Sequence, residues 1–373
     1  MTCIHCLTDN KYKDRSSGKC SKCNHEFAFE PKEGAPLTDS AFSRMIDVVS
    51  SGGTVRFHFD HLYYQICRAK FKGRWRQVGI GLMWLVLAAP IALALSLFYR
   101  QMLGWAAVVA GLAGLALFEG YGITRKWLTS PQTVQLDALK IRRMLDRWIH
   151  VHGRPEGFIG PKQMATTDKK KRQLNAELHK EALDYSFDRA VICDRPETVD
   201  VLLANKFHFE NNCAILGVDN YPPQVFDTVC KMLRSNPKLT VLVIHDATAQ
   251  GCALAHKLRN DGNWFAPGVR IVDVGLRPAH ARFFRGQVVD QQRSAAEVLL
   301  PGISAEEALW LQRYSLALAA MRPEQLIKRL FRALTQAESV AEAAQVDTDA
   351  VDSDVVVFGV DADTSDGGAD SFG

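Results

Sequence analysis

The stretch TVLVIHDATAQGCALAHKL, residues 240–258, changes its hydrophobic pattern at the pair His245-Asp246. Before the pair, residues 240–244 are β-branched or aliphatic, which predicts a short strand buried on both faces. After it, apolar residues recur at helical spacing, and they are preceded by Thr248, a residue type that caps helices. The stretch therefore predicts a buried strand, a tight acidic turn and a helix.

The same pattern recurs in the flanking sequence. Further strands are predicted at RAVIC (189–193), CAILGV (213–218) and VRIVDVG (269–275), and helices at 196–207, 222–236 and 248–260. Strands that alternate with helices predict a parallel sheet covered on both faces, and such a sheet binds ligands at the carboxyl ends of its strands. We expect an α/β domain, Toprim-like or Rossmann-like, at residues 183–290.

An acidic residue follows or ends each predicted strand. These residues are Asp194, Asp219, Asp246 and Asp273. Carboxylates at one edge of a sheet favour a Mg²⁺ site, so Asp194, Asp246 and Asp273 are the candidate catalytic residues of a metal-dependent phosphodiesterase. Alternatively, the acids only end strands and cap helices, and His245 is a hydrogen-bonded structural residue.

The segment HDATAQGCALA resembles the Asp-x-Asp-x-x-Gly motif of Toprim domains, which occur in topoisomerases, primases and nucleases of the overcoming-lysogenization-defect type. The resemblance covers about residues 188–277. It implies a Glu in proton transfer after the first strand and Asp residues holding Mg²⁺ after the third. Asp194 falls at the Glu position, Asp246 matches the first Asp, and Gly251 falls near the Gly. The second acid is replaced by Thr248, which favours a degenerate, noncatalytic domain over an active enzyme.

The amino terminus contains two cysteine pairs, Cys3-x-x-Cys6 and Cys20-x-x-Cys23. Paired thiolates at this spacing predict a closed Cys₄ site for structural Zn²⁺, with redox-active thiols as the alternative. Residues 1–30 resemble the zinc ribbons found at the start of many bacterial proteins. The resemblance implies a structural metal and a surface that binds nucleic acid or protein.

Residues 37–72 predict a small winged-helix-like element made of a helix, a strand at 54–59 and a second helix. Within it, DHLYYQI resembles the Tyr-Tyr motif of the winged-helix domain in the type IIB topoisomerase A-subunit family. That resemblance would place Tyr64 at the position of the attacking tyrosine. The family's arginine is missing, and a packing role is favoured because aromatic residues fill the cores of small amphipathic elements.

Two apolar runs occupy residues 77–124, and no charged residue lies between Arg76 and Arg100. Runs of this length predict two transmembrane helices. Basic residues flank the pair on both outer sides, which predicts an integral protein of the inner (cytoplasmic) membrane with both termini in the cytoplasm.

The remaining segments complete the expected multidomain organisation. An amphipathic helix and linker are expected at 130–182, C-terminal helices at 291–344 and a disordered acidic tail at 345–373. Ten acidic residues and no Lys or Arg follow Arg332. Because the net charge of the whole chain is +4, the part before this tail carries about +14.

The sequence thus predicts a membrane-anchored binding or scaffold protein with a structural zinc ribbon. Nucleic acid is a candidate partner, as is a protein that binds the acidic tail. The alternative is a Mg²⁺-dependent nuclease tethered to the membrane. The oligomeric state is not indicated by any pattern.

Overall fold

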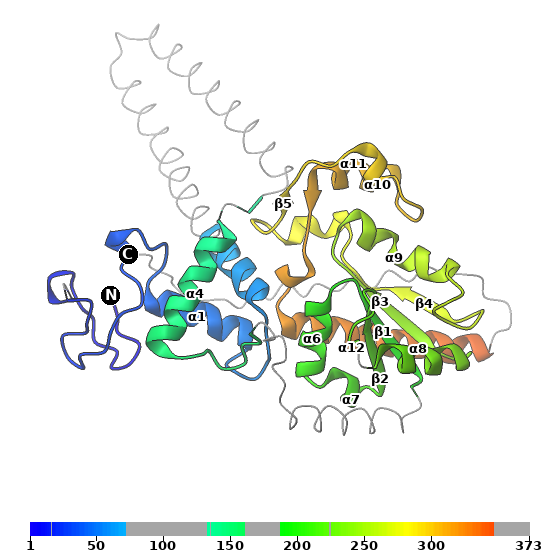
Figure 1. Cartoon of the computed structure of the whole chain (residues 1–373), viewed down its shortest axis with the longest axis horizontal. Coiled ribbons are helices and arrows are strands. Elements are labelled where there is room, and N and C mark those ends of the chain that lie inside the picture. Colours follow the sequence, from blue (N-terminus) through cyan, green and yellow to red (C-terminus); the bar gives the residue numbers. More distant parts are fainter. Residues whose placement is uncertain (16, 72–132, 135, 161–186, 224, 347–373) are drawn as a thin grey trace, which may run out of the picture.

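The computed structural model describes residues 1–15, 17–71, 133–134, 136–160, 187–223 and 225–346. Its largest element is a sheet of four parallel strands, arranged in the order β2-β1-β3-β4 (Figure 1). The strands are β1 (Arg189–Cys193), β2 (Cys213–Gly217), β3 (Thr240–Ile244) and β4 (Arg270–Asp273). All four begin within two residues of their predicted positions, and the predicted parallel α/β sheet is confirmed.

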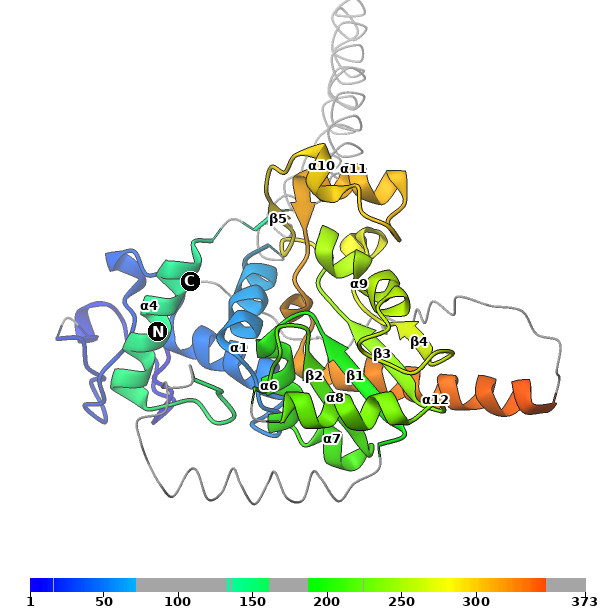
Figure 2. The same cartoon turned by 45° about the vertical axis from the view of Figure 1, so that its right-hand side comes forward.

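Helices cover both faces of the sheet because successive strand residues point to opposite sides. Val191 and Cys193 pack in one cluster with residues of α6 (Pro196–Ala204) and α12 (Pro323–Val346). The alternate residues of β1 pack in a second cluster with α8 (Phe226–Ser235) and α9 (Ala249–Asn260). Figure 2 shows α12 running along the sheet and extending past it.

The strand order creates one topological switch point. The crossover from β1 leads through α6, with the short α7 (Phe207–Glu210), to β2 on one side. The crossover from β3 leads through α9 to β4 on the other side and over the opposite face. The loops after β1 and β3 therefore diverge, and this is where open α/β sheets form a ligand crevice.

A separate helical core lies beside the sheet (Figure 1). It joins α1 (Asp39–Ser50), a helix at 59–71 and α4 (Ala138–His152) around Phe42, Leu62 and Ile141, which are fully buried. The strand expected at 54–59 is not formed, and only a parallel bridge between Phe57 and Phe158 occurs there. The amphipathic helix predicted from the sequence is α4, and its apolar side fills this core.

The C-terminal region differs from its prediction in one segment. The C-terminal helices expected at 291–344 are interrupted after α11 (Ala305–Arg313), where the chain continues in extended form across the carboxyl end of the sheet. Leu316 exchanges two backbone hydrogen bonds with Ala247, which follows β3. The remaining elements are α10 (Ala295–Val298), α11 (Ala305–Arg313), β5 (Val289–Asp290), β6 (Tyr314–Ser315), η1 (Lys13–Arg15), η2 (Pro31–Glu33), η3 (Pro278–Phe283) and η4 (Leu318–Ala320).

The fold class inferred from the sequence is corrected in one respect, the transmembrane hairpin. Within the described ranges, no helix has both the length and the apolar character needed to cross a bilayer. Residues 77–124, the expected hairpin, lie outside those ranges, as do the linker at 161–182 and the tail from residue 347. The described fold therefore consists of a parallel α/β sheet, a helical unit and a four-cysteine cluster.

Candidate functional site

The four cysteines of the two pairs come together as predicted. The Sγ atoms of Cys3 and Cys23 lie 3.7 Å apart, and those of Cys6 and Cys20 lie 3.6 Å apart. All four sulfur atoms lie within 4.8 Å of one another. Thiolates bound tetrahedrally to Zn²⁺ at 2.3 Å are about 3.8 Å apart, so the arrangement fits this ion.

Two small hairpins present these thiolates. Each is closed by an antiparallel bridge, between Thr2 and Asp9 in the first and between Lys19 and Glu26 in the second. Backbone N–H groups of Cys23 and Lys22 point at the sulfur of Cys20 and lower the pKa of this thiol to about 6. The pKa of Cys23, whose hydrogen bonds to the other thiols favour its protonated form, is raised to about 12, so the four thiols titrate as one coupled group. Four thiolates around one ion would leave no position for substrate.

A buried acid attaches the four-cysteine segment, compatible with a zinc ribbon, to the helical core. The carboxylate of Asp39, in the first turn of α1, accepts hydrogen bonds from the backbone N–H groups of Ala28 and Phe29 at 2.8 and 2.9 Å. His152 of α4 contacts the same carboxylate at 2.7 Å, and its other ring nitrogen lies 3.2 Å from His25. The ribbon is thus held by polar contacts to both α1 and α4.

At the switch point, Asp246 follows β3 and is 2% exposed. Its Oδ1 accepts a hydrogen bond from the backbone N–H of Leu318 at 2.6 Å. Its Oδ2 accepts one from Nε of Arg195, also at 2.6 Å, and the Arg195 side chain is 50% exposed. The predicted metal-binding acid therefore has a protein donor on each oxygen.

Asp194, after β1, lies beside this pair. Its Oδ2 accepts a hydrogen bond from the backbone N–H of Asp246 at 2.7 Å, whereas its Oδ1 is buried without a partner. Burial, together with the neighbouring charge of Asp246, raises the pKa of Asp194 to about 7. Burial also raises the pKa of Asp246, and Arg195 opposes this rise.

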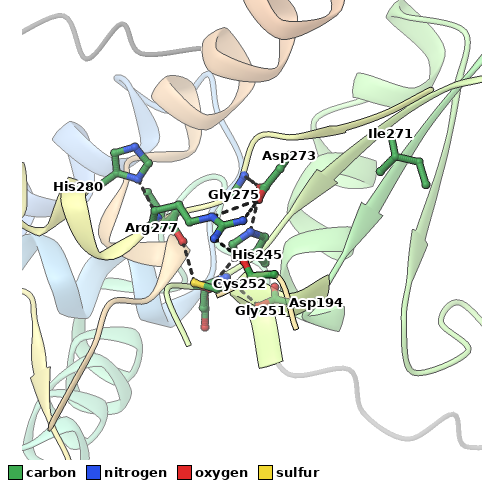
Figure 3. Close-up of polar contacts among 12 residues, drawn as sticks. Asp194, His245, Gly251, Cys252, Ile271, Asp273, Gly275, Arg277 and His280 are labelled. Carbon is green, nitrogen blue, oxygen red and sulfur yellow. Dashed lines mark hydrogen bonds and ion pairs between the residues drawn. The ribbon is translucent and has the colours of Figure 1, made fainter. Parts of the chain in front are cut away.

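Asp273 ends β4 and belongs to a different network (Figure 3). Its Oδ1 contacts Nε2 of His245 at 2.9 Å, and its Oδ2 accepts a hydrogen bond from Arg277 at 2.6 Å. Burial alone would raise the pKa of Asp273, but His245 and Arg277 outweigh it and lower the pKa well below the ordinary value. The other ring nitrogen of His245 faces the carbonyl oxygen of Asp246, which only accepts, so both ring nitrogens carry protons.

Two glycines make room for the His245 ring. A Cβ atom at Gly275 would lie 2.2 Å from the ring carbon Cδ2 of His245. A Cβ atom at Gly251 would lie 2.4 Å from the carbonyl oxygen of Asp246. The Gly251 that resembles the family glycine is thus needed here for close packing against the turn.

The three candidate catalytic acids do not assemble into one ion site. In the described part of the chain, the four cysteines are the only group of three or more potential ligands close enough to share a metal ion. Asp194 and Asp246 are neighbours, Asp273 pairs with His245, and Asp219 is exposed at the end of β2.

The sequence pattern does not predict Arg195, Arg277 or Leu318 as partners of the acids. Arg195 directly follows Asp194, so its proximity to the switch point was available from the sequence. Leu318 reaches Asp246 from 72 residues away. Tyr64, the residue matched to an attacking tyrosine, packs in the core beside the sheet, and burial raises the pKa of its hydroxyl well above the ordinary value.

A small cavity of about 20 Å³ opens at the switch point. A volume of this size holds one or two water-sized groups. It is lined by residues of the helix at 59–71 and the residue before it, of α6, of α12, of the loops after β1 and β3, and of the segment around η4. These residues are His58, Asp60, His61, Arg195, Glu197, Thr198, Val201, Asp246, Ala317, Leu318, Ala319 and Leu326.

Comparisons of the chain with protein-family models, with curated proteins and with solved structures found no match.

Proposed function

We propose that this chain is a zinc-containing binding protein whose Toprim-like α/β domain recognises a ligand without catalysing phosphoryl transfer. The observation that carries the proposal is that the carboxylate oxygens of two of the acids already have hydrogen-bond partners within the protein. Both oxygens of Asp246 and both oxygens of Asp273 accept hydrogen bonds from protein donors. Metal-dependent phosphoryl transfer needs carboxylate oxygens that are free to hold the ion.

The segment that crosses the carboxyl end of the sheet supports the same proposal. Residues 314–320 pair with the turn after β3 through Leu316 and place the N–H of Leu318 on Asp246. Arg195 lies on the remaining oxygen of Asp246, so a guanidinium occupies the place that a divalent cation would take. The cavity left beside these groups is too small for a nucleotide.

The zinc ribbon adds a second binding element to the proposal. A closed Cys₄ site has a structural role, and the exposed surface of such a ribbon is what a partner contacts. Leu7, 77% exposed, lies at the tip of the first hairpin directly after Cys6. We propose nucleic acid or a protein as the partner of the ribbon. The protein partner is the same one that binds the acidic tail.

One observation favours a second candidate function, a Mg²⁺-dependent nuclease. The carboxyl group of Asp194 is buried, has one oxygen without a partner and has a pKa raised to about 7. A group that titrates near neutral pH is suited to general acid–base catalysis, and such groups cluster at active sites. This function requires Arg195, which is half-exposed, to leave Asp246 when a metal binds.

A cleavage assay on the full chain separates the two functions. The purified protein is incubated with labelled single-stranded DNA, duplex DNA and RNA in Mg²⁺ or Mn²⁺, alongside the variants Asp246→Asn and Asp219→Asn. We expect no metal-dependent cleavage by any of the three proteins. Cleavage by the native chain and by Asp219→Asn, but not by Asp246→Asn, would overturn the proposal and establish the enzyme.

The same labelled nucleic acids identify the partner class. Fluorescence anisotropy at several salt concentrations measures their binding to the native chain. Binding that weakens steeply with salt indicates contacts to phosphates. Absence of binding at low salt would exclude nucleic acid and leave a protein as the partner.

A further inference from the structure

The four-cysteine segment and the helical core meet between two consecutive residues. Phe27 packs against Cys3 and Cys20 in the small cluster around the thiols. The next two residues, Ala28 and Phe29, are buried in the helical core with α1 and α4. Because no residue lies between the two clusters, the arrangement of the thiols is physically connected to the way the segment docks on the core.

The first cysteine pair also contacts the core. Ile4 and His5 lie between Cys3 and Cys6. Ile4 packs against the helical core, and the ring of His5 stacks on the ring of His25 with their centroids 4.9 Å apart. The residues between these two thiols therefore reach both the core and the second hairpin.

His25 joins the second hairpin to α4. Its backbone N–H points at the sulfur of Cys23, and its carbonyl oxygen accepts a hydrogen bond from the N–H of Cys20 at 2.8 Å. Its side-chain Nε2 lies 3.2 Å from Nδ1 of His152, and the two rings stack. The position of His25 is thus set by the hairpin that carries two of the thiols, and its side chain transmits that position to α4.

This series of contacts ends on a buried carboxylate. The carboxylate of Asp39 is fully buried and faces three donors, which are Nε2 of His152 and the backbone N–H groups of Ala28 and Phe29. When His152 donates from Nε2 to Asp39, the Nδ1 of the neutral ring accepts a hydrogen bond from His25. Asp39 therefore fixes the orientation of His152, and His152 in turn fixes His25.

We propose that Asp39 and His152 are positioning residues of the four-cysteine metal site, so that metal binding and docking of the segment on α1 and α4 favour each other. The sulfur atoms have the spacing that fits Zn²⁺. Metal binding at such sites is coupled to folding of the segment that supplies the ligands, and partners outside the ligand set change metal affinity by about 10–100-fold. The proposal rests on the zinc-binding part of the function proposed above.

The first experiment measures the Zn²⁺ affinity of the full chain by competition with a chelating indicator. In His152→Phe an aromatic ring remains against Trp148, but the contacts with Asp39 and His25 are lost. We expect the variant to bind Zn²⁺ about tenfold more weakly than the native chain. The matched control is His150→Phe, the same substitution at an exposed residue of the same helix, which should leave the affinity unchanged.

Two measurements separate this role from a general loss of stability. Ile66→Val makes a small cavity in the same helical core and should lower the melting temperature without changing the Zn²⁺ affinity. The absorption spectrum of the Co²⁺-substituted protein reports the thiolate ligands, and it should be the same in the native chain and in His152→Phe. An equal loss of Zn²⁺ affinity in Ile66→Val and His152→Phe would overturn the proposal.

The reverse effect is measured on the native chain by hydrogen exchange. The N–H groups of Ala28 and Phe29 donate to Asp39 when the segment is docked. Coupling between two equilibria is reciprocal, so these amides should exchange about tenfold faster after a chelator removes the metal than with Zn²⁺ bound. This measurement needs no substitution, and it therefore tests the proposal even where His152→Phe folds poorly.

The outcomes distinguish this proposal from the zinc site itself. Equal Zn²⁺ affinity in the native chain and in His152→Phe, or unchanged exchange at Ala28 and Phe29 after metal removal, would refute the coupling and leave the zinc site in place. A native chain that binds no Zn²⁺ would refute the zinc-containing function and the coupling together.

Discussion

Replacement of Asp194 by Asn should stabilise the protein, and the gain should grow with pH. The pKa of this carboxyl group rises from its ordinary 3.8 to about 7 on folding. A group whose pKa is raised by folding costs no stability below its unfolded pKa and costs its full amount above its folded pKa. Because Asn carries no charge, the variant removes this cost.

The magnitude follows from the same change in pKa. Ionising the carboxyl group in its folded environment costs at most about 4 kcal/mol at pH 8. Asp194 titrates together with Asp246, so we expect roughly half of this bound, about 2 kcal/mol. The oxygen of Asn can still accept the hydrogen bond from the N–H of Asp246. For a body of this size the gain corresponds to a rise in melting temperature of about 4–8 °C at pH 8.

The assay is differential scanning fluorimetry of the full chain at several pH values between 4.5 and 8. The control is Asp188→Asn, the same substitution at an exposed residue directly before β1. We expect the Asp194→Asn variant to gain least near pH 4.5 and most at pH 8, and the control to differ from the native chain by less than about 0.5 kcal/mol at every pH. An Asp194→Asn variant that is no more stable than the native chain at pH 8 would refute the argument that this carboxyl is buried at a cost.

Two further substitutions test the packing and the metal site. Gly275→Ala should lower the melting temperature by about 10 °C, because the added methyl group displaces the His245 ring and breaks its buried hydrogen bonds. The corresponding loss of folding free energy is roughly 3–5 kcal/mol. The control in the same thermal scan is Gly262→Ala, whose added methyl group meets no neighbouring atom. The native chain should contain about one Zn²⁺ by elemental analysis, Cys20→Ser should lose it, and the buried but unpaired Cys230→Ser should retain it. Normal folding of Cys20→Ser without metal would contradict a structural zinc site.

The contacts of the switch point explain how two neighbouring buried acids are stabilised at the carboxyl edge of the sheet. Asp246 is buried and ionised only because Arg195 and the N–H of Leu318 supply positive charge and a donor. Asp194 has one such donor and therefore titrates near neutral pH.

The parallel sheet was predictable from the sequence because its signals are local. The strands are runs rich in β-branched and aliphatic residues, and two of the following helices begin with a cap or a proline, as Thr248 and Pro196 do in α9 and α6. The cysteine cluster was predictable for a similar reason. Each Cys-x-x-Cys pair sets its two thiolates close together within one hairpin, so only the meeting of two hairpins had to be inferred.

The hydrogen-bond partners of the acids could not be predicted from any local sequence pattern. The sequence placed Asp194, Asp246 and Asp273 at the same edge of the sheet, which is correct, but the donors that reach Asp194 and Asp246 come from more than 50 residues away in the chain. Leu318 reaches Asp246 because the chain leaves the helical form after Arg313 and pairs with the turn after β3. Local apolar periodicity had favoured a continuing helix there.

The sequence by itself therefore determined the elements, the polarity of the sheet and the identity of the four cysteines that come together, since each of these follows from neighbouring residues. The tertiary structure alone decided which donors meet Asp194 and Asp246, because that depends on where segments separated by more than 50 residues come to lie. It also decided that His61, from the helical unit, shares a cavity wall with Arg195 and Asp246, which follow β1 and β3. A hydrogen bond or charge pair has its effect only over a few ångströms, and spacing along the chain does not specify such distances between remote residues.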